Sequence, residues 1–111
     1  MRIAIAHWNE RVSPVFDVST QLVLLDIANG LEQKRQYFKL LERETHERAR
    51  VLLRLRVDTL ICGAVSRDAE KALVSAGINV FSFVCGDLEQ ILNAFIEKRL
   101  SEKRFLMPGH P

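Results

Sequence analysis

The sequence has little cysteine, proline and glycine: its 111 residues include two Cys, three Pro and five Gly. Two cysteines are too few for a disulfide scaffold, and in a reducing compartment they would be thiols or metal ligands. The longest apolar runs are about five residues, far short of the roughly 20 that span a bilayer. The apolar stretch at the N-terminus is also too short for a signal peptide. These absences predict a cytoplasmic chain.

The charge balance gives no support for nucleic-acid binding, and we expect no nucleic-acid partner. There are 16 Lys and Arg against 14 Asp and Glu, a net charge of +2, whereas nucleic-acid-binding surfaces are strongly basic. The apolar fraction of 48% excludes a disordered chain and fits one globular domain. We expect this domain over residues 1–100. Because the chain ends in Met-Pro-Gly-His-Pro, we expect a flexible tail over residues 101–111.

The first 40 residues predict three strands. The dipeptide Asn29-Gly30 is the strongest short hairpin signal, because both residues accept a positive φ. The second and third strands are therefore expected to be antiparallel, and the polar third strand to lie at a sheet edge. The three expected strands are Arg2–Ala6, Gln21–Ile27 and Glu32–Leu40.

The rest of the chain predicts helices alternating with strands. The segment Thr45–Leu55 lacks Gly and Pro, and its acids precede its arginines, which matches the helix dipole. Ser66 is expected to cap a second helix that ends at Gly77. Asp87 and Gln90 predict a capping box at the start of a third helix. The intervening strands are expected at Thr59–Cys62 and Asn79–Val84.

This order of elements predicts an α/β fold with a ribonuclease-H-like three-layer architecture. The expected sheet is mixed and five-stranded, with three helices. The two helical crossovers make the last strands parallel to each other and should be right-handed. The first strand is expected to lie next to the fourth, where it joins the hairpin to the βαβ units.

Two cysteines and a histidine end three of the predicted strands. In open α/β sheets, ligands bind beyond the carboxyl ends of the strands. His7 follows the first strand, Cys62 ends the fourth and Cys85 follows the fifth, and each Cys precedes a Gly, a short loop and a helix start. The repeated pattern predicts that both thiols lie at one sheet edge, each directly before a helix.

These three side chains are candidate metal ligands. A thiol near a helix N-terminus has its thiolate favoured, and thiolate and imidazole suit copper(I), zinc or an iron–sulfur species. A purely structural role for Cys62 and Cys85 also stays open, because a free Cys at a strand end is often a small buried apolar residue. The spacing of the two cysteines matches no pair of CxxC zinc motifs.

Enzyme chemistry has little support in the sequence. A nuclease on this fold would need several carboxylates around two metal ions, but the first strand, Ile3-Ala4-Ile5, carries none. No Walker loop or GxGxxG motif is present, and Ser13 is not in a GxSxG motif. We therefore expect a protein without catalytic activity.

Several segments together resemble the dinitrogenase iron–molybdenum cofactor biosynthesis family, over about residues 1 to 100. They are the first strand, Val12-Ser13-x-x-Phe16, Asn29-Gly30, Asp58-Thr59-Leu60-Ile61-Cys62-Gly63 and Ala76-Gly77-Ile78-Asn79-Val80, in that order. The resemblance implies a ribonuclease-H-like fold without nuclease activity. It also implies binding of a metal–sulfur cluster or its precursor, of the iron–molybdenum or molybdenum–copper sulfide type, and cofactor-assembly proteins as partners.

The chain departs from the family in its first loop. Family members commonly carry Ser-x-His-Phe-Gly there, whereas this chain has Ser13-Pro14-Val15-Phe16-Asp17. Val15 therefore replaces the histidine, and Asp17 replaces the glycine. We infer from the residues alone that His7 could substitute as a ligand.

Two functions follow as hypotheses. The first is a non-enzymatic carrier for an anionic metal–sulfur cluster, held by arginines and by backbone donors at helix N-termini. The second is a small interaction or regulatory module without a cofactor, which uses the basic run Lys98–Arg104 and an exposed Phe105-Leu106-Met107. The candidate cofactor-binding residues of the first hypothesis are Arg11, Ser13, Gly63, Ser66, Arg67 and Gly86.

Overall fold

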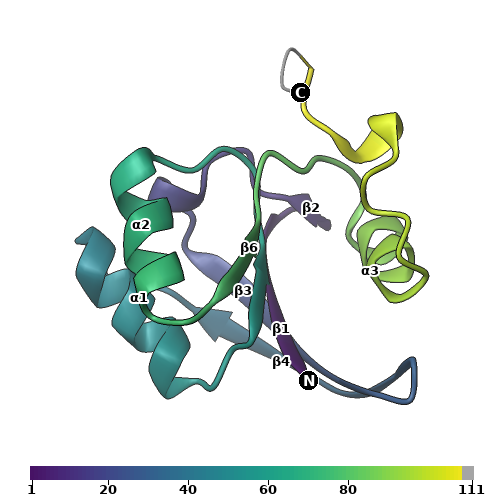
Figure 1. Cartoon of the computed structure of the whole chain (residues 1–111), viewed down its shortest axis with the longest axis horizontal. Coiled ribbons are helices and arrows are strands. Elements are labelled where there is room, and N and C mark those ends of the chain that lie inside the picture. The colour runs from purple at the N-terminus through teal and green to yellow at the C-terminus, as the bar shows by residue number, and fades with distance from the viewer. Residues whose placement is uncertain (109–111) are drawn as a thin grey trace.

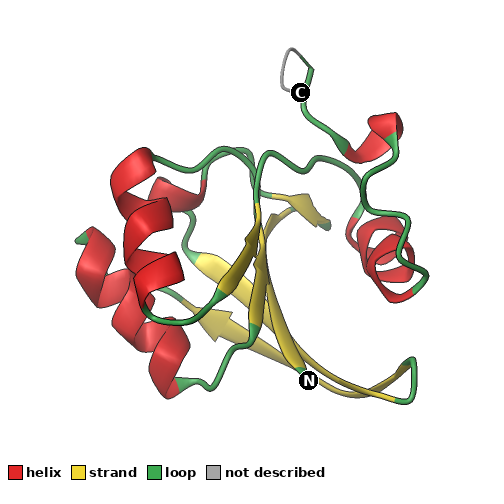
Figure 2. Ribbon diagram, viewed as in Figure 1, coloured by secondary structure: helices red, strands yellow, loops and turns green. Residues whose placement is uncertain are grey.

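A mixed β-sheet lies between two layers of helices in the computed structural model, which describes residues 1–108 (Figures 1 and 2). Helices α1 and α2 cover one face of the sheet, and α3 covers the other. The α/β class, the three helices and the three layers predicted from the sequence are confirmed. The elements are β1 (Arg2–Trp8), β2 (Arg11–Val12), η1 (Phe16–Val18), β3 (Gln21–Ala28), β4 (Leu31–Lys39), α1 (Thr45–Arg54), β5 (Thr59–Ile61), α2 (Arg67–Ser75), β6 (Asn79–Phe81), α3 (Leu88–Ile96) and η2 (Lys103–Phe105).

The strand order is β4-β3-β1-β5-β6, with the short β2 paired to β1. Strand β3 is antiparallel to both β4 and β1, whereas β5 is parallel to both β1 and β6. The predicted position of the first strand, between the hairpin and the βαβ units, is therefore confirmed. It makes β1 the central strand of the sheet.

Two apolar cores lie on the two faces of the sheet, because successive side chains of a strand point to opposite faces. From β1, Ala4 and Ala6 pack towards α1 and α2, whereas Ile3 and Ile5 pack towards α3. All four side chains are fully buried. Within the described residues, no helix has the length and apolar character needed to cross a membrane.

The helix ends follow the predicted capping chemistry. The hydroxyl of Ser66 accepts a hydrogen bond from the amide of Ala69 at 3.1 Å, and α2 stops before Gly77, which has a φ of +83°. Asp87 caps α3 through its side chain. Glu44 caps α1 in the same way, although the sequence did not single it out.

Two local features differ from the sequence prediction. A tight turn through Asn9 and Glu10, with φ of 51° and 63°, folds β2 back on β1. The Asn-Glu pair lacks the glycine that is typical of such turns, so the sequence analysis did not predict this hairpin. The last strand ends at Phe81 instead of Val84, because Phe83 has a φ of 59° and turns the chain out of the strand.

The C-terminal segment packs on the domain over residues 101–108, where a flexible tail was expected. Phe105 is buried, and its carbonyl accepts a hydrogen bond from the amide of Cys85 at 2.8 Å. The amide of Met107 donates to the carbonyl of Phe83 at 2.9 Å. The interaction-module hypothesis relied on an exposed Phe105, and this expectation was wrong. Residues 109–111 of the expected tail lie outside the described residues.

The loops beyond the carboxyl ends of β1, β5 and β6 bond to one another through their backbones. The amide of Phe16 donates to the carbonyl of Ala64, and the amide of Ala64 donates to that of Pro14, both at 2.8 Å. The amide of Phe83 donates to the carbonyl of Gly63 at 2.8 Å. The three loops therefore form one connected layer above the sheet.

Gly63 lies at the closest approach within this layer. A Cβ atom there would lie 2.5 Å from the carbonyl oxygen of Pro14 and would also collide with that of Ser13. Because both obstacles are backbone atoms, no side-chain rotation relieves the clash. This position therefore needs glycine for space, and not for an unusual φ.

We predict that Gly63→Ala lowers the free energy of unfolding by about 3 kcal/mol, the upper range of overpacking costs. Gly77→Ala is the matched control, because its Cβ would meet nothing within 4 Å and pays only for the positive φ. It should cost about 1 kcal/mol. Urea denaturation of both variants measures the difference, and equal losses would contradict the close-approach argument.

Candidate functional site

Cys62 lies at the carboxyl end of β5 but faces the interior. Its side chain is fully buried in the core between the sheet and helices α1 and α2, with Leu60 and Ala69 in the same cluster. Burial, together with the nearby carboxylates of Glu70 and Asp17, raises the pKa of the Cys62 thiol to about 12. The thiol is therefore neutral at pH 7, and Cys62 packs as a small apolar side chain.

Cys85 is partly exposed and lies between two other segments of the carboxyl edge. On one side, its amide is bonded to the C-terminal segment at Phe105. On the other, the amide of Val12 donates to the carbonyl of Gly86 at 3.0 Å, and the backbones of Arg11 and Asp87 form an isolated antiparallel β-bridge. The backbone around this thiol is thus held from both sides.

The two Cys-Gly pairs are not structurally equivalent. Cys62 comes directly after β5, whereas residues 82–84 separate Cys85 from the end of β6. Cys85 is two residues before the N-cap Asp87, and Cys62 is four residues before the N-cap Ser66. Both cysteines follow parallel strands at the same edge of the sheet, but only Cys85 is accessible.

His7 lies on the other face of the sheet from Cys62. By the alternation of β1, it shares the α3 side with Ile3 and Ile5. Its ring makes an edge contact with Tyr37, with 5.7 Å between ring centroids, and its Nε2 has no hydrogen-bond partner. Burial lowers the pKa of His7, so the imidazole is neutral at pH 7.

The predicted metal ligands therefore do not come together as one site. Cys62 faces the α1 and α2 core, His7 faces the α3 side, and Cys85 lies at the loop layer. Among residues 1–108, no group of three or more His, Cys, Asp or Glu side chains is placed to hold a metal ion. The sheet itself separates the two buried candidates, which sequence spacing could not reveal.

Carboxylates of the chain itself accept hydrogen bonds at the start of α2 and α3. Asp17 accepts hydrogen bonds from the amide of Ser66 at 2.9 Å and from its hydroxyl at 2.5 Å. Asp87 accepts from the amides of Glu89 and Gln90 at 3.1 and 3.3 Å. The helix N-termini were expected to hold an anionic cluster, but the amides of Ser66, Ala69, Glu89 and Gln90 already bond to side chains of the chain itself.

Arg48 is a buried residue that the sequence analysis did not identify. One of its nitrogens donates to the carbonyls of Phe16 and Ser19 at 2.7 and 2.5 Å, and another donates to that of Glu42 at 2.6 Å. Its guanidinium also lies 4.8 Å from the centroid of the Phe16 ring. Arg48 fixes the first loop against α1. An arginine in an amphipathic helix carries no sequence signal for such a role.

The other predicted binding residues divide into structural and exposed ones. Ser13 is buried and accepts a hydrogen bond from the hydroxyl of Ser19 at 2.8 Å, and Gly63 is the close approach described above. Arg11 and Arg67 are exposed at the loops after β1 and β5. The carboxyl edge thus offers one accessible thiol and exposed cationic side chains.

We predict that native protein reacts with iodoacetamide at pH 8 at Cys85 alone, and at Cys62 only after unfolding. Folding raises the pKa of the Cys62 thiol. As the pH rises, this thiol therefore loses its proton at a lower pH in the unfolded chain than in the folded protein. The thiol's contribution to stability is therefore complete below about pH 9 and is lost between pH 9 and about 12. Mass spectrometry of the alkylated peptides tests the first statement. Equal labelling of both cysteines in the native protein would contradict it.

Solved structures with the same fold include three with high similarity. PH0822 has a TM-score of 0.83 at 22% identity, covering 89% of this chain and 91% of its own. The apo form of the orange protein from Desulfovibrio gigas has a TM-score of 0.74 at 24% identity, covering 99% and 94%. A candidate dinitrogenase from Methanocaldococcus jannaschii has a TM-score of 0.72 at 17% identity, covering 89% and 90%. At these identities the likeness establishes the fold.

The sequence itself matches one family over most of its length. No curated protein matches significantly. The family described as dinitrogenase iron-molybdenum cofactor matches residues 1–98, and this range includes all the strands and the three α-helices. The resemblance inferred from the order of short segments is confirmed by this match. The chain belongs to the dinitrogenase iron-molybdenum cofactor family.

Proposed function

We propose that this protein is a carrier that binds an anionic metal–sulfur cluster, or its precursor, as cargo at the carboxyl edge of the sheet. The observation that carries the proposal is the accessible thiol of Cys85, held between β2 and the C-terminal segment. Family membership supports the class of cargo, which is of the iron–molybdenum or molybdenum–copper sulfide type. The proteins that assemble or receive such a cluster would be its partners.

The chemistry of the edge supports one direct bond to the cluster. A thiolate is a soft ligand, and it suits copper(I) and sulfide-bridged metals better than magnesium or calcium. The buried Cys62 and the internally capped helix N-termini leave Cys85 as the direct ligand that this edge offers. A single bond to the protein is compatible with a carrier, since the other cluster positions stay available to a recipient.

Positive charge around the thiol would favour an anionic cargo. Arg11 lies on β2, whose backbone pairs with the segment from Gly86 to Asp87, and Arg67 lies at the start of α2. Arg104 lies on the C-terminal segment, 4.6 Å from the centroid of the Phe105 ring, and forms an ion pair with Glu102 at 3.0 Å that reduces its net charge contribution. These exposed side chains contribute long-range attraction that depends on salt concentration.

A carrier role is preferred to an enzymatic one on the arrangement of the acidic side chains. Of the acids at the carboxyl edge, Asp17 bonds to Ser66, the N-cap of α2, and Asp87 caps α3. Two-metal hydrolysis requires carboxylates that converge on two cations. Both of these acids instead accept hydrogen bonds at the start of a helix.

We predict that Cys85→Ser loses direct binding of the cargo, whereas Cys62→Ala retains it. The probe is tetrathiomolybdate with copper(I), titrated anaerobically into the full chain and followed by absorption spectroscopy and metal analysis. Parent protein should bind more weakly at lower pH, because a thiol must lose its proton before it ligates. The buried control variant should lose stability by about 1–3 kcal/mol without losing the metal.

The comparison of the two variants decides the role of the thiols. If Cys85→Ser binds as tightly as the parent, direct ligation by Cys85 is refuted. The alternative function, an interaction module without a cofactor, would then be favoured. If folded Cys62→Ala lost binding while Cys85→Ser kept it, the buried Cys62 thiol would be the ligand. The core between the sheet and helices α1 and α2 would then have to open to admit the cluster. Thermal unfolding of each variant establishes that it is folded.

We further predict no phosphodiesterase activity with magnesium or manganese. The central strand carries Ile3, Ala4 and Ile5 where two-metal nucleases need acids. An RNA–DNA hybrid incubated with the purified chain is the test substrate. Hydrolysis that disappears in Asp87→Asn would overturn the carrier proposal.

A further inference from the structure

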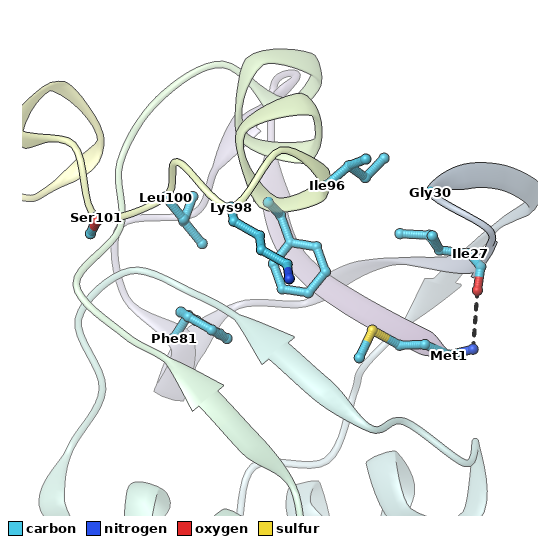
Figure 3. Close-up of a pocket in the computed structure, with 9 residues that line it drawn as sticks. Met1, Ile27, Gly30, Phe81, Ile96, Lys98, Leu100 and Ser101 are labelled. Atoms are coloured by element: carbon cyan, nitrogen blue, oxygen red, sulfur yellow. Dashed lines mark hydrogen bonds between the residues drawn. The ribbon is translucent and has the colours of Figure 1, made fainter.

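A cavity lies away from the carboxyl-edge loops, beneath the C-terminal end of α3 (Figure 3). Its volume is about 450 Å³, within the range of small-molecule sites. It shares no residue with the candidate cluster site. The lining residues are Met1, Ile27, Gly30, Phe81, Phe95, Ile96, Lys98, Leu100 and Ser101.

The walls of this cavity are mainly apolar. Phe81 and Phe95 contact each other edge to face, with 5.7 Å between ring centroids. Phe81 is 44% exposed, so part of its ring lies open beside the cavity. An apolar ligand that covered this exposed apolar surface would gain free energy from its removal from water.

Two cationic groups border this apolar space: the exposed side chain of Lys98 and the N-terminal ammonium of Met1, which donates a hydrogen bond to the carbonyl of Ile27 at 3.1 Å. Lys98 follows the end of α3 in a left-handed conformation, with a φ of 60°, and Figure 3 shows its side chain extending into the cavity. None of the ion pairs among residues 1–108 involves Lys98, and no acidic residue lines the cavity. Ser101 adds a hydroxyl at the rim.

We propose that this cavity binds an amphipathic carboxylate, with its alkyl or aryl body between α3 and the sheet. The carboxylate would accept a hydrogen bond from the Lys98 ammonium, and the Ser101 hydroxyl is a second donor. The apolar walls select the body of the ligand, and the Lys98 ammonium selects the sign of its head group. This selection by charge separates the proposed ligand from neutral and cationic amphiphiles of the same length.

Decanoate is the first probe, with decyltrimethylammonium as the comparator of opposite charge and decanol as the neutral one. Isothermal titration calorimetry on the full chain should give saturable binding of decanoate at one site. Decanol should bind more weakly, and decyltrimethylammonium should not bind. The amide resonances of Phe81 and Lys98 should shift, whereas that of Cys85 should not.

Two variants and one control test the assigned roles. Lys98→Gln should weaken decanoate binding roughly tenfold, through loss of a charge-assisted hydrogen bond, and leave decanol unaffected. Phe81→Ala should weaken both. Lys71→Gln removes an exposed cation from α2, on the other face of the sheet, and should change neither.

Three outcomes would overturn the proposal. They are the absence of saturable decanoate binding, equal binding of the cationic comparator, and an unchanged affinity in folded Lys98→Gln. Sedimentation of the parent as a dimer that Phe81→Ala dissociates would also overturn it, because a second copy would then cover the cavity. Since the probes contain no metal, their failure leaves the cluster proposal to be decided by its own titration.

Discussion

The carboxyl edge of the sheet depends on the close packing of Gly63 against the backbone of Ser13 and Pro14. This contact lets the loops after β1 and β5 bond to each other, and Phe83 then joins the loop after β6 to the same layer. Arg48 holds the first loop from the opposite side through carbonyls of Phe16 and Ser19. The position of every candidate functional group at this edge follows from these backbone contacts.

The sequence predicts the sheet well because its signals are local. Continuous apolar runs, the Asn29-Gly30 turn and the caps at Ser66 and Asp87 each require only neighbouring residues. The site was less predictable because burial is set by contacts distant in sequence. Cys62 and Cys85 have similar local surroundings, yet one faces a core and the other lies beside the C-terminal segment. The burial of Arg48 was missed for the same reason, because its partners Phe16 and Ser19 are distant in sequence.

The first loop explains how this chain differs from the pattern common in its family. Where a histidine and a glycine are common, this chain has Val15 and Asp17. The Asp17 carboxylate accepts hydrogen bonds from the amide and hydroxyl of Ser66, the N-cap of α2. The substitution thus replaces a potential ligand and fills an anion-binding position at once. In our account, Cys85 supplies the direct bond instead.

The most direct test of this account is nuclear magnetic resonance mapping of the amide groups during anaerobic titration with tetrathiomolybdate and copper(I). The account predicts the largest shifts at Cys85 and Gly86, with Arg11 on the paired β2 also affected. The amides of Leu60 and Ala69, which surround the buried Cys62, should change little. Shifts centred on that core, or confined to the α3 cavity, would contradict a cluster site at the carboxyl edge.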